Sequence, residues 1–166
     1  MDIDAELSNI LQELSERLPK FHDGRINYSK SDTAVVLTCY VRYNGKLLLL
    51  KRSDQVSTYQ GYWHSVAGYV DDTRCTLKDK ALEELREEVS IFPDVIENMI
   101  FFPPKKIIDN HIHRIWVVCN ILIDLKKQPD LILDFEHTDM VWIDPSEIAN
   151  YQTVPGVSNA VKLLLT

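Results

Sequence analysis

The chain has 166 residues, a formal net charge of −7 and a pI near 5.2. This balance argues against a partner made of nucleic acid polymer, because proteins that bind a phosphate backbone carry basic patches. Hydrophobic residues make up 45% and charged residues 26% of the chain, which is typical of an ordinary globular protein. At this length we expect one domain over residues 1–166, large enough to bury about 70% of its unfolded surface.

The cysteines and the apolar segments predict the compartment in which the protein is found. Cys39, Cys75 and Cys119 are widely spaced and form no paired metal or disulfide pattern. We therefore expect a reducing environment and a cytoplasmic location. No apolar run approaches the length of a membrane-spanning helix, and the N-terminus lacks the features of a signal peptide. We expect no membrane partner.

Residues 1–32 predict a helix and its connection to the core. An apolar stripe between Asp2 and Leu18 has helical spacing, and Pro19 ends it. We expect the stripe to dock on its own domain, and a homodimer contact is the alternative.

Residues 33–148 predict the core. Two runs at 33–43 and 46–51 are rich in β-branched, aromatic or leucine residues and flank Asn44-Gly45, which is typical of a two-residue hairpin. A short strand over 63–68 follows, and it ends in a glycine.

A helix over 77–89 comes next, and Phe92-Pro93 ends it. Three strands are then expected over 95–102, 105–108 and 112–125. Residues 149–166 predict a C-terminal helix, which we expect to begin near Val154 with Pro155 in its first turn.

The helix over 77–89 has an unusual acidic face. Glu84, Glu87 and Glu88 stand at i, i+3 and i+4, so their carboxylates converge. Like-charge neighbours destabilise a bare helix by roughly 0.2–0.5 kcal/mol each. A divalent cation such as Mg²⁺ or Mn²⁺ would reverse that sign, because it binds several carboxylate oxygens. The alternative is a solvated acidic face in which Lys80 pairs with Glu84.

The order of elements around this helix resembles the Nudix box of the Nudix hydrolase family. A strand ends in Gly68, an acidic loop follows, and Glu84, Glu87 and Glu88 fall on the family's three metal-binding glutamates. The resemblance implies an α/β fold, an α/β/α sandwich with a mixed β-sheet, here with an added N-terminal helix. It also implies a metal site at these glutamates, with the Ala67 carbonyl as a further candidate ligand.

The box departs from the family pattern in its loop. One residue is inserted, so the family's first glutamate falls near Arg74 or Cys75. Asp71 and Asp72 are the closest acids that could replace it.

The box also lacks two of the family's residues on the helix. Glu83 stands where the family has arginine, and Ser90 where it has glycine. Arg52, Arg74 or Arg86 could take over the role of the missing arginine in holding a carboxylate.

A second stretch resembles the end of many Nudix domains, where a loop glutamate precedes a strand that carries tryptophan. Glu136 lies six residues before Trp142 and is a candidate catalytic carboxylate by this resemblance, beside Glu84 and Glu87. On the substrate side, Arg52 could meet a phosphate, or it could be a surface cation. Tyr59 and Trp63 could stack on a base, or they could simply pack under a loop.

The resemblance implies a metal-dependent hydrolase of a nucleoside diphosphate linked to another group, with ADP-ribose as a family-level guess. The expected cofactor is Mg²⁺ or Mn²⁺, and the expected partner is a small nucleotide-type substrate. Two alternatives remain open at this point. One is a nucleotide-binding module with little turnover, and the other is an enzyme similar to isopentenyl diphosphate isomerase, which needs a catalytic cysteine.

Overall fold

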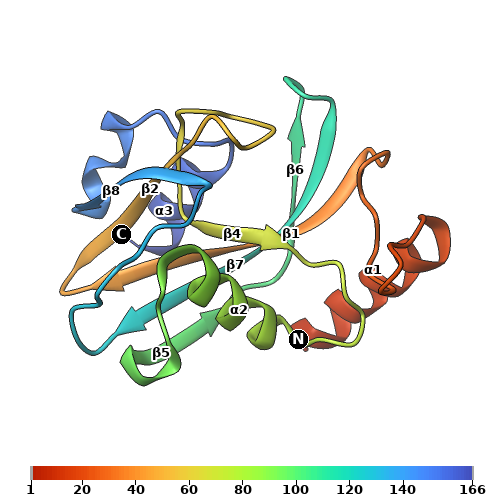
Figure 1. Ribbon diagram of the computed structural model, residues 1–166, viewed down its shortest axis with the longest axis horizontal. Helices are drawn as coiled ribbons and strands as arrows, with labels where there is room; N and C mark the ends of the chain where they lie inside the picture. Colours follow the sequence, from red (N-terminus) through yellow and green to blue (C-terminus); the bar gives the residue numbers. More distant parts are fainter. Residues whose placement is uncertain (1, 166) are drawn as a thin grey trace.

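A mixed sheet of eight strands forms the middle layer of the computed structural model, which describes residues 2–165 (Figure 1). The main strand order is β3-β2-β1-β7-β5, and β4 pairs with β1, β6 with β7, and β8 with β2. Within the described residues, β1 and β7 pair in parallel and the other named strands pair antiparallel. Helices cover both faces, so the expected α/β/α sandwich with a mixed sheet is confirmed.

The bounds of the elements follow the chain order. They are α1 (Ile3–Arg17), β1 (Thr33–Tyr43), β2 (Lys46–Arg52), β3 (Trp63–His64), β4 (Val66–Tyr69), α2 (Leu77–Val89), η1 (Pro93–Val95), β5 (Ile96–Phe101), β6 (Lys105–Asp109), β7 (Arg114–Leu125), β8 (His137–Ile143), η2 (Pro145–Asn150) and α3 (Val157–Leu164).

One face of the sheet is covered by α2 together with the added N-terminal helix α1. The apolar stripe of α1 buries Leu7, Leu11 and Leu14 in the same core cluster as Leu85 of α2. Asp2 caps the helix by accepting a hydrogen bond from the Ala5 backbone N–H. The expectation that this stripe docks on its own domain is therefore confirmed, and Figure 1 shows α1 beside the beginning of α2.

The opposite face is covered by η2 and α3. Ile148 of η2 and Val157 and Val161 of α3 pack on Tyr40 of β1 and Leu49 of β2. Because successive side chains of a strand point to opposite faces, β1 serves both layers, with Leu37, Cys39 and Val41 in the α2 layer.

The hairpin between β1 and β2 forms as predicted. Asn44 has φ +48° and Gly45 has φ +76°, and both left-handed conformations are what a tight two-residue turn needs. The turn pairs Tyr43 with Lys46 and sets the register of the two strands.

Two sequence expectations were wrong in detail. The strand expected over 63–68 is two strands, because β3 pairs with β2 whereas β4 pairs with β1, and the chain changes partner at Ser65. The last helix begins at Val157 rather than near Val154. The Val154 backbone N–H donates to the Trp63 carbonyl and so extends the sheet, which leaves Pro155 outside the helix.

None of the helices within residues 2–165 is long and apolar enough to cross a membrane.

Candidate active site

The helix α2 starts and ends where its local sequence dictates. The Thr76 hydroxyl accepts a hydrogen bond from the Asp79 backbone N–H, and the Asp79 carboxylate accepts one from the Thr76 backbone N–H. This capping box satisfies two backbone donors at the start of the helix. Ser90 ends the helix in a left-handed conformation with φ +59°, the geometry that favours glycine at this position. The predicted bounds of this helix are confirmed.

Two carboxylates of α2 are pressed against β4. Glu88 is 3% exposed, and its Oε2 accepts a hydrogen bond from the Ala67 backbone N–H at 3.3 Å. Glu84 lies against Gly68, where an added Cβ would overlap with its Oε1 and Cδ atoms. Gly68 is therefore required here by the close approach of a side chain, at an ordinary backbone angle. Glu87 also faces the site, but its side chain is half-exposed.

Burial controls the acidity of these groups. Burial raises the pKa of Glu88 well above its usual range, and the nearby charges of Glu84, Glu136 and Asp134 add to this effect. Burial also raises the pKa of Glu84, although its hydrogen bond with Lys80 opposes the shift. A face of solvated glutamates would show neither effect, so the solvated-face alternative is wrong for Glu84 and Glu88.

Lys80 is the cation that contacts Glu84. Its Nζ lies 2.9 Å from Glu84 Oε1 and 3.3 Å from Glu83 Oε2, and the lysine side chain is mostly buried. The i,i+4 pairing expected for these two residues is thus present. Burial lowers the pKa of Lys80, but the hydrogen bonds and charges of Glu84 and Glu83 outweigh it and raise the pKa overall. A lysine one turn earlier on the helix thus holds the carboxylate of Glu84.

The three arginines considered for that role lie elsewhere. Arg52 Nε donates to the Thr58 carbonyl at 3.0 Å, and Arg74 binds both oxygens of Asp72. Arg86 lies 3.8 Å from Glu87 at the surface. Arg74 therefore holds a carboxylate of the loop, Arg86 lies near one at the surface, and it is Lys80 that contacts Glu84.

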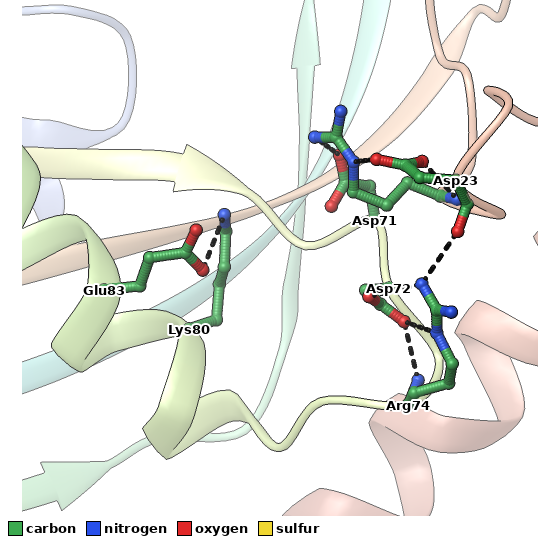
Figure 2. A network of polar contacts seen from close by, with 7 residues as sticks. Asp23, Asp71, Asp72, Arg74, Lys80 and Glu83 are labelled. Carbon is green, nitrogen blue, oxygen red and sulfur yellow. Dashed lines mark hydrogen bonds and ion pairs between the residues drawn. The ribbon is translucent and has the colours of Figure 1, made fainter.

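The acidic loop before α2 is tied to the N-terminal segment (Figure 2). Arg74 bridges the Asp72 carboxylate and the Asp23 carbonyl, and its hydrogen bonds lower the pKa of Asp72 to about 2. Arg25 binds Asp23 and also Asp71, which is almost fully buried. Asp72 is thus used to fasten the loop, whereas Asp71 remains on the wall of the adjoining cleft.

That cleft has a volume of about 760 Å³ and lies between α2, β4, β7 and the loop after β2. It brings together seven residues proposed from the sequence, namely Arg52, Tyr59, Ala67, Glu84, Glu87, Glu88 and Glu136. Within residues 2–165 its lining includes six carboxylate side chains, from Asp71, Glu83, Glu84, Glu87, Glu88 and Glu136. It includes three lysine or arginine side chains, Arg25, Arg52 and Lys80. The cleft therefore carries a surplus of negative charge.

Glu136 is held beside Arg52 by the backbone. The Ser53 N–H donates to the Glu136 carbonyl at 2.7 Å, at the point where β2 meets β8. Asp134 fixes the same loop, because its Oδ1 accepts from the Glu136 N–H at 3.2 Å and contacts His137 Nδ1 at 2.9 Å. Burial and the charge of Asp134 raise the pKa of Glu136.

The two aromatic residues proposed for stacking occupy different places. Tyr59 lines the cleft, and its hydroxyl donates to Asp109 Oδ2 at 2.5 Å. Trp63 is not among the residues that line the cleft. Its ring packs edge-on against Tyr151 at 5.5 Å, on the side of the sheet that leads to η2.

Several cleft residues had not been proposed from the sequence. His64 is half-buried, desolvation together with Arg52 and His137 lowers its pKa to about 3, and its Nδ1 has no partner among the described residues. Trp116 and Asn120 of β7 lie in a run of mostly apolar residues that predicted a buried strand and nothing more. Arg25 lies in a segment with no motif at all.

The donor set suits a hard divalent cation. Carboxylates and a backbone carbonyl are the ligands that Mg²⁺ and Mn²⁺ prefer, and burial of Glu84 and Glu88 leaves negative charge that one lysine only partly offsets. Gly68 leaves room for a carboxylate against the backbone that a Cβ would fill. Within residues 2–165, no three histidine, cysteine or carboxylate side chains are grouped so that they could hold a metal ion as they stand.

An α/β/α sandwich in which a carboxylate-bearing helix borders a cleft on a mixed sheet is typical of the Nudix fold class. The family model described as NUDIX domain matches residues 32–164. The chain therefore belongs to the Nudix family.

Individual relatives agree with this assignment. The chain is 32% identical over 101 residues to an uncharacterized Nudix hydrolase NudL from Enterobacter sp. (strain 638), covering 61% of this chain and 52% of that protein. The chain thus matches about half the length of this curated relative.

The fold is shared with solved structures of low sequence identity. A MutT NUDIX hydrolase from Burkholderia pseudomallei has a TM-score of 0.64 at 19% identity, covering 80% of this chain and 98% of that one. The NUDIX domain of Shewanella oneidensis NrtR, solved with ADP ribose, has a TM-score of 0.65 at 15% identity, covering 78% and 84%.

Proposed function

We propose that this chain is a Nudix-type pyrophosphohydrolase that uses Mg²⁺ or Mn²⁺ to hydrolyse a nucleoside diphosphate linked to another group. The observation that supports it most is the burial of Glu84 and Glu88 side by side against β4. Lys80 of the same helix contacts Glu84 and offsets only part of this charge. Buried carboxylates without enough countercharge lower the stability of the folded protein, and a bound cation would restore that stability.

The charge of the cleft supports a cation as part of the substrate complex. A diphosphate would be repelled by the six carboxylates and only partly attracted by the three cationic side chains of the described lining. When bound, the metal would neutralise phosphate oxygens and lower the pKa of a coordinated water. Glu84, Glu87 and Glu88 would hold it, with the Ala67 carbonyl as a further ligand.

The protein's own residues supply binding and proton transfer. Arg52 lies at the end of β2 beside Glu136 and can donate to a phosphate oxygen. Glu136 can accept the proton of the attacking water, because burial shifts its pKa upwards, and Glu84 and Glu87 are the alternative bases. Attack at phosphorus breaks the phosphoanhydride bond and releases a nucleotide and a phosphomonoester.

ADP-ribose is the first substrate to test. The Shewanella NrtR domain was crystallised with this ligand, and we carry that chemistry to the present chain as part of the proposal. Isomerase chemistry has weaker support, because Cys39 and Cys119 are buried and none of the three cysteines is among the described residues that line the cleft.

One observation favours a nucleotide-binding module with little turnover. Lys80 occupies an oxygen of Glu84, so part of the countercharge is already built into the helix. Metal-dependent product release from a nucleotide-type substrate decides between this module and a hydrolase.

The proposal is tested by product release from ADP-ribose, a dinucleoside polyphosphate and a nucleotide sugar. We expect hydrolysis of at least one of them with Mg²⁺ or Mn²⁺ and none above the buffer rate with a chelator. Binding of ADP-ribose without metal-dependent product release from any of the three would favour the binding module and contradict the hydrolase.

Gly68→Ala is expected to keep the fold and lose most of this activity. The added methyl group would push the Glu84 carboxylate from its place, since the overlap involves the end of a flexible side chain rather than the backbone. We expect turnover to fall on the order of 10- to 100-fold, as for loss of a residue that orients a metal ligand. Manganese affinity and circular dichroism would separate this effect from unfolding.

The double variant Gly68→Ala with Glu84→Ala provides the control. It should bind Mn²⁺ no more weakly than Glu84→Ala alone, because the clash is with the Glu84 side chain. A further loss in the double variant would mean that Gly68 matters for another reason.

A further inference from the structure

The loop between β2 and β3, residues 53–62, forms one wall of the cleft. Its residues 55–59 line the cleft, and none of residues 54–61 is buried. Figure 1 shows this loop in gold, reaching from the end of β2 toward β6. A segment without buried side chains is easily displaced, because little packing energy opposes its opening. The contacts that hold this loop therefore decide the shape of the cleft.

Two side chains hold the loop together internally. Gln60 Nε2 donates to the Asp54 carbonyl at 3.1 Å and to the Val56 carbonyl at 2.9 Å. Arg52 Nε donates to the Thr58 carbonyl at 3.0 Å. These hydrogen bonds close the loop on itself, so it can move as one unit. They also connect the arginine at the end of β2 to the backbone of the loop.

A single hydrogen bond holds the loop to a distant part of the fold. The Tyr59 hydroxyl donates to Asp109 Oδ2 at 2.5 Å, at the end of β6. Among residues 2–165, no other hydrogen bond joins residues 54–61 to a part of the chain outside residues 52–62. The acceptor is itself fixed, because Asp109 is 4% exposed and its Oδ1 accepts from the His111 backbone N–H at 3.1 Å.

The backbone of Tyr59 supplies a second observation. Its φ of +52° lies in the left-handed region, which is unfavourable for a residue with a bulky side chain. Strain of this kind persists only where the surrounding contacts enforce it. Here those contacts are the hydrogen bond to Asp109 and the edge-on packing of the ring on Tyr62 at 5.2 Å.

The position of the loop also determines how Arg52 is oriented. Its Nε is occupied by the carbonyl of Thr58, the residue that precedes Tyr59. Its Nη atoms make no hydrogen bond with any described residue, and Arg52 lines the cleft, so these N–H groups can donate to a phosphate oxygen. If the loop moved away from Asp109, the Thr58 carbonyl would move with it, and the arginine would lose the contact that orients it.

We propose that Tyr59 and Asp109 are positioning residues, which hold the β2–β3 loop at the cleft and thereby keep Arg52 in the orientation that binds phosphate. The inference rests on the proposed function for the phosphate group at Arg52. It differs from a stacking role for Tyr59, because stacking needs the ring, whereas positioning needs the hydroxyl.

Tyr59→Phe removes the hydroxyl and keeps the ring. We expect amide hydrogen exchange at Gly61 and Tyr62, whose N–H groups donate within the loop, to become about 5- to 50-fold faster. Tyr62→Phe is the matched control, because it removes a hydroxyl of the same loop that has no hydrogen-bond partner among the described residues. It should leave exchange at Gly61 unchanged. Unchanged exchange in Tyr59→Phe would overturn the inference.

Ligand binding tests the link to Arg52. With Mg²⁺ and the non-hydrolysable α,β-methylene analogue of ADP-ribose, we expect Tyr59→Phe to weaken binding about 3- to 10-fold in calorimetry. Arg52→Lys keeps a charge for the phosphate but lacks the Nε that contacts Thr58. In the Arg52→Lys background, Tyr59→Phe should therefore weaken binding less than about 2-fold.

A merely structural role for the Tyr59 hydroxyl would weaken binding equally in both backgrounds, because a general loss of stability does not act through Arg52. Equal losses in the two backgrounds, or wild-type affinity in Tyr59→Phe, would overturn the positioning role.

The proposed function and the present inference fail in different ways. If the analogue binds wild-type protein equally well with Mg²⁺ and with a chelator, the proposed metal-dependent hydrolase fails, while the comparison of the two backgrounds still decides the positioning role. If the analogue does not bind wild-type protein at all, the phosphate-binding role of Arg52 fails together with the inference. Exchange at Gly61 and Tyr62 then reports only whether Tyr59 holds the loop.

Discussion

Glu88→Gln is expected to reduce metal-dependent hydrolysis on the order of 100-fold or more and to make the metal-free protein more stable. The Glu88 carboxylate is 3% exposed, has one backbone N–H as its hydrogen-bond donor and faces the charges of Glu84, Glu136 and Asp134. A glutamine keeps the size and the contact with Ala67 and removes the charge. The slower hydrolysis and the higher stability of the metal-free protein therefore have the same cause, which is the removal of this charge.

The stability gain should depend on pH. Burial first, then the charge of Glu84, raises the folded-state pKa of Glu88 above its ordinary value of 4.5. The stability linked to this group is therefore complete below about pH 4.5 and is lost as the pH rises through the folded-state pKa. In chelator, thermal unfolding should show little difference between variant and wild type near pH 5 and a clear advantage for Glu88→Gln near pH 8.

Glu97→Gln, an exposed glutamate on β5, is the matched control and should leave both properties unchanged. Full turnover in Glu88→Gln would show that Glu88 is not a metal ligand. A lower unfolding temperature of the variant near pH 8 would show that Glu88 is not a source of unpaired charge.

Lys80→Met is expected to lower the free energy of unfolding of the metal-free protein by about 2–3 kcal/mol, which is slightly below the usual cost of breaking a fully buried pair. The side chains of Lys80 and Glu84 are 16% and 11% exposed, and their charged atoms lie 2.9 Å apart. Methionine keeps the length of the lysine chain but leaves Glu84 without its cation. Urea unfolding in chelator measures the loss.

The double variant Lys80→Met with Glu84→Gln should recover most of this stability, because both charges of the pair are then absent. Saturating Mn²⁺ should recover more stability in Lys80→Met than in wild type, since the ion replaces the missing countercharge. Equal stabilisation of both proteins by Mn²⁺ would mean that lysine and metal do not share Glu84.

Local signals in the sequence predicted the helix α2 and the β1–β2 hairpin well. Phe92-Pro93 predicted the end of the helix, and Asn44-Gly45 accepts the positive φ angles of the turn. Each of these signals acts within a few residues, so no knowledge of the tertiary structure is needed.

The misses involve contacts between distant segments. Nothing in the sequence around Ser65 indicates that the chain changes its pairing partner there from β2 to β1. Tyr59 and Trp63 are close in sequence, yet one reaches Asp109 and the other packs on Tyr151. Spacing along a strand gives the two faces, but it does not tell which face opens to a cleft and which is covered by a helix.

Two of the cleft-lining residues, Asn120 and Trp116, were missed for a related reason. Asn120 and Trp116 belong to a strand buried on both faces, so its sequence shows no clean alternation of polar and apolar residues. The side-chain oxygen of Asn120 has no hydrogen-bond partner among the described residues, which becomes visible only when its surroundings are known. Motifs in the sequence predicted a role for the carboxylates, whereas these two cleft residues carry no motif.

The parallel pairing of β1 with β7 has a consequence for the order of events in folding. Arg42 and Asp124, which form an ion pair at the end of these strands, are 82 residues apart in the sequence. Closing a loop of that length is entropically costly, and contacts of long range slow the search for the native state. The cleft is lined by residues of both strands, so it is complete only once these two distant segments have paired.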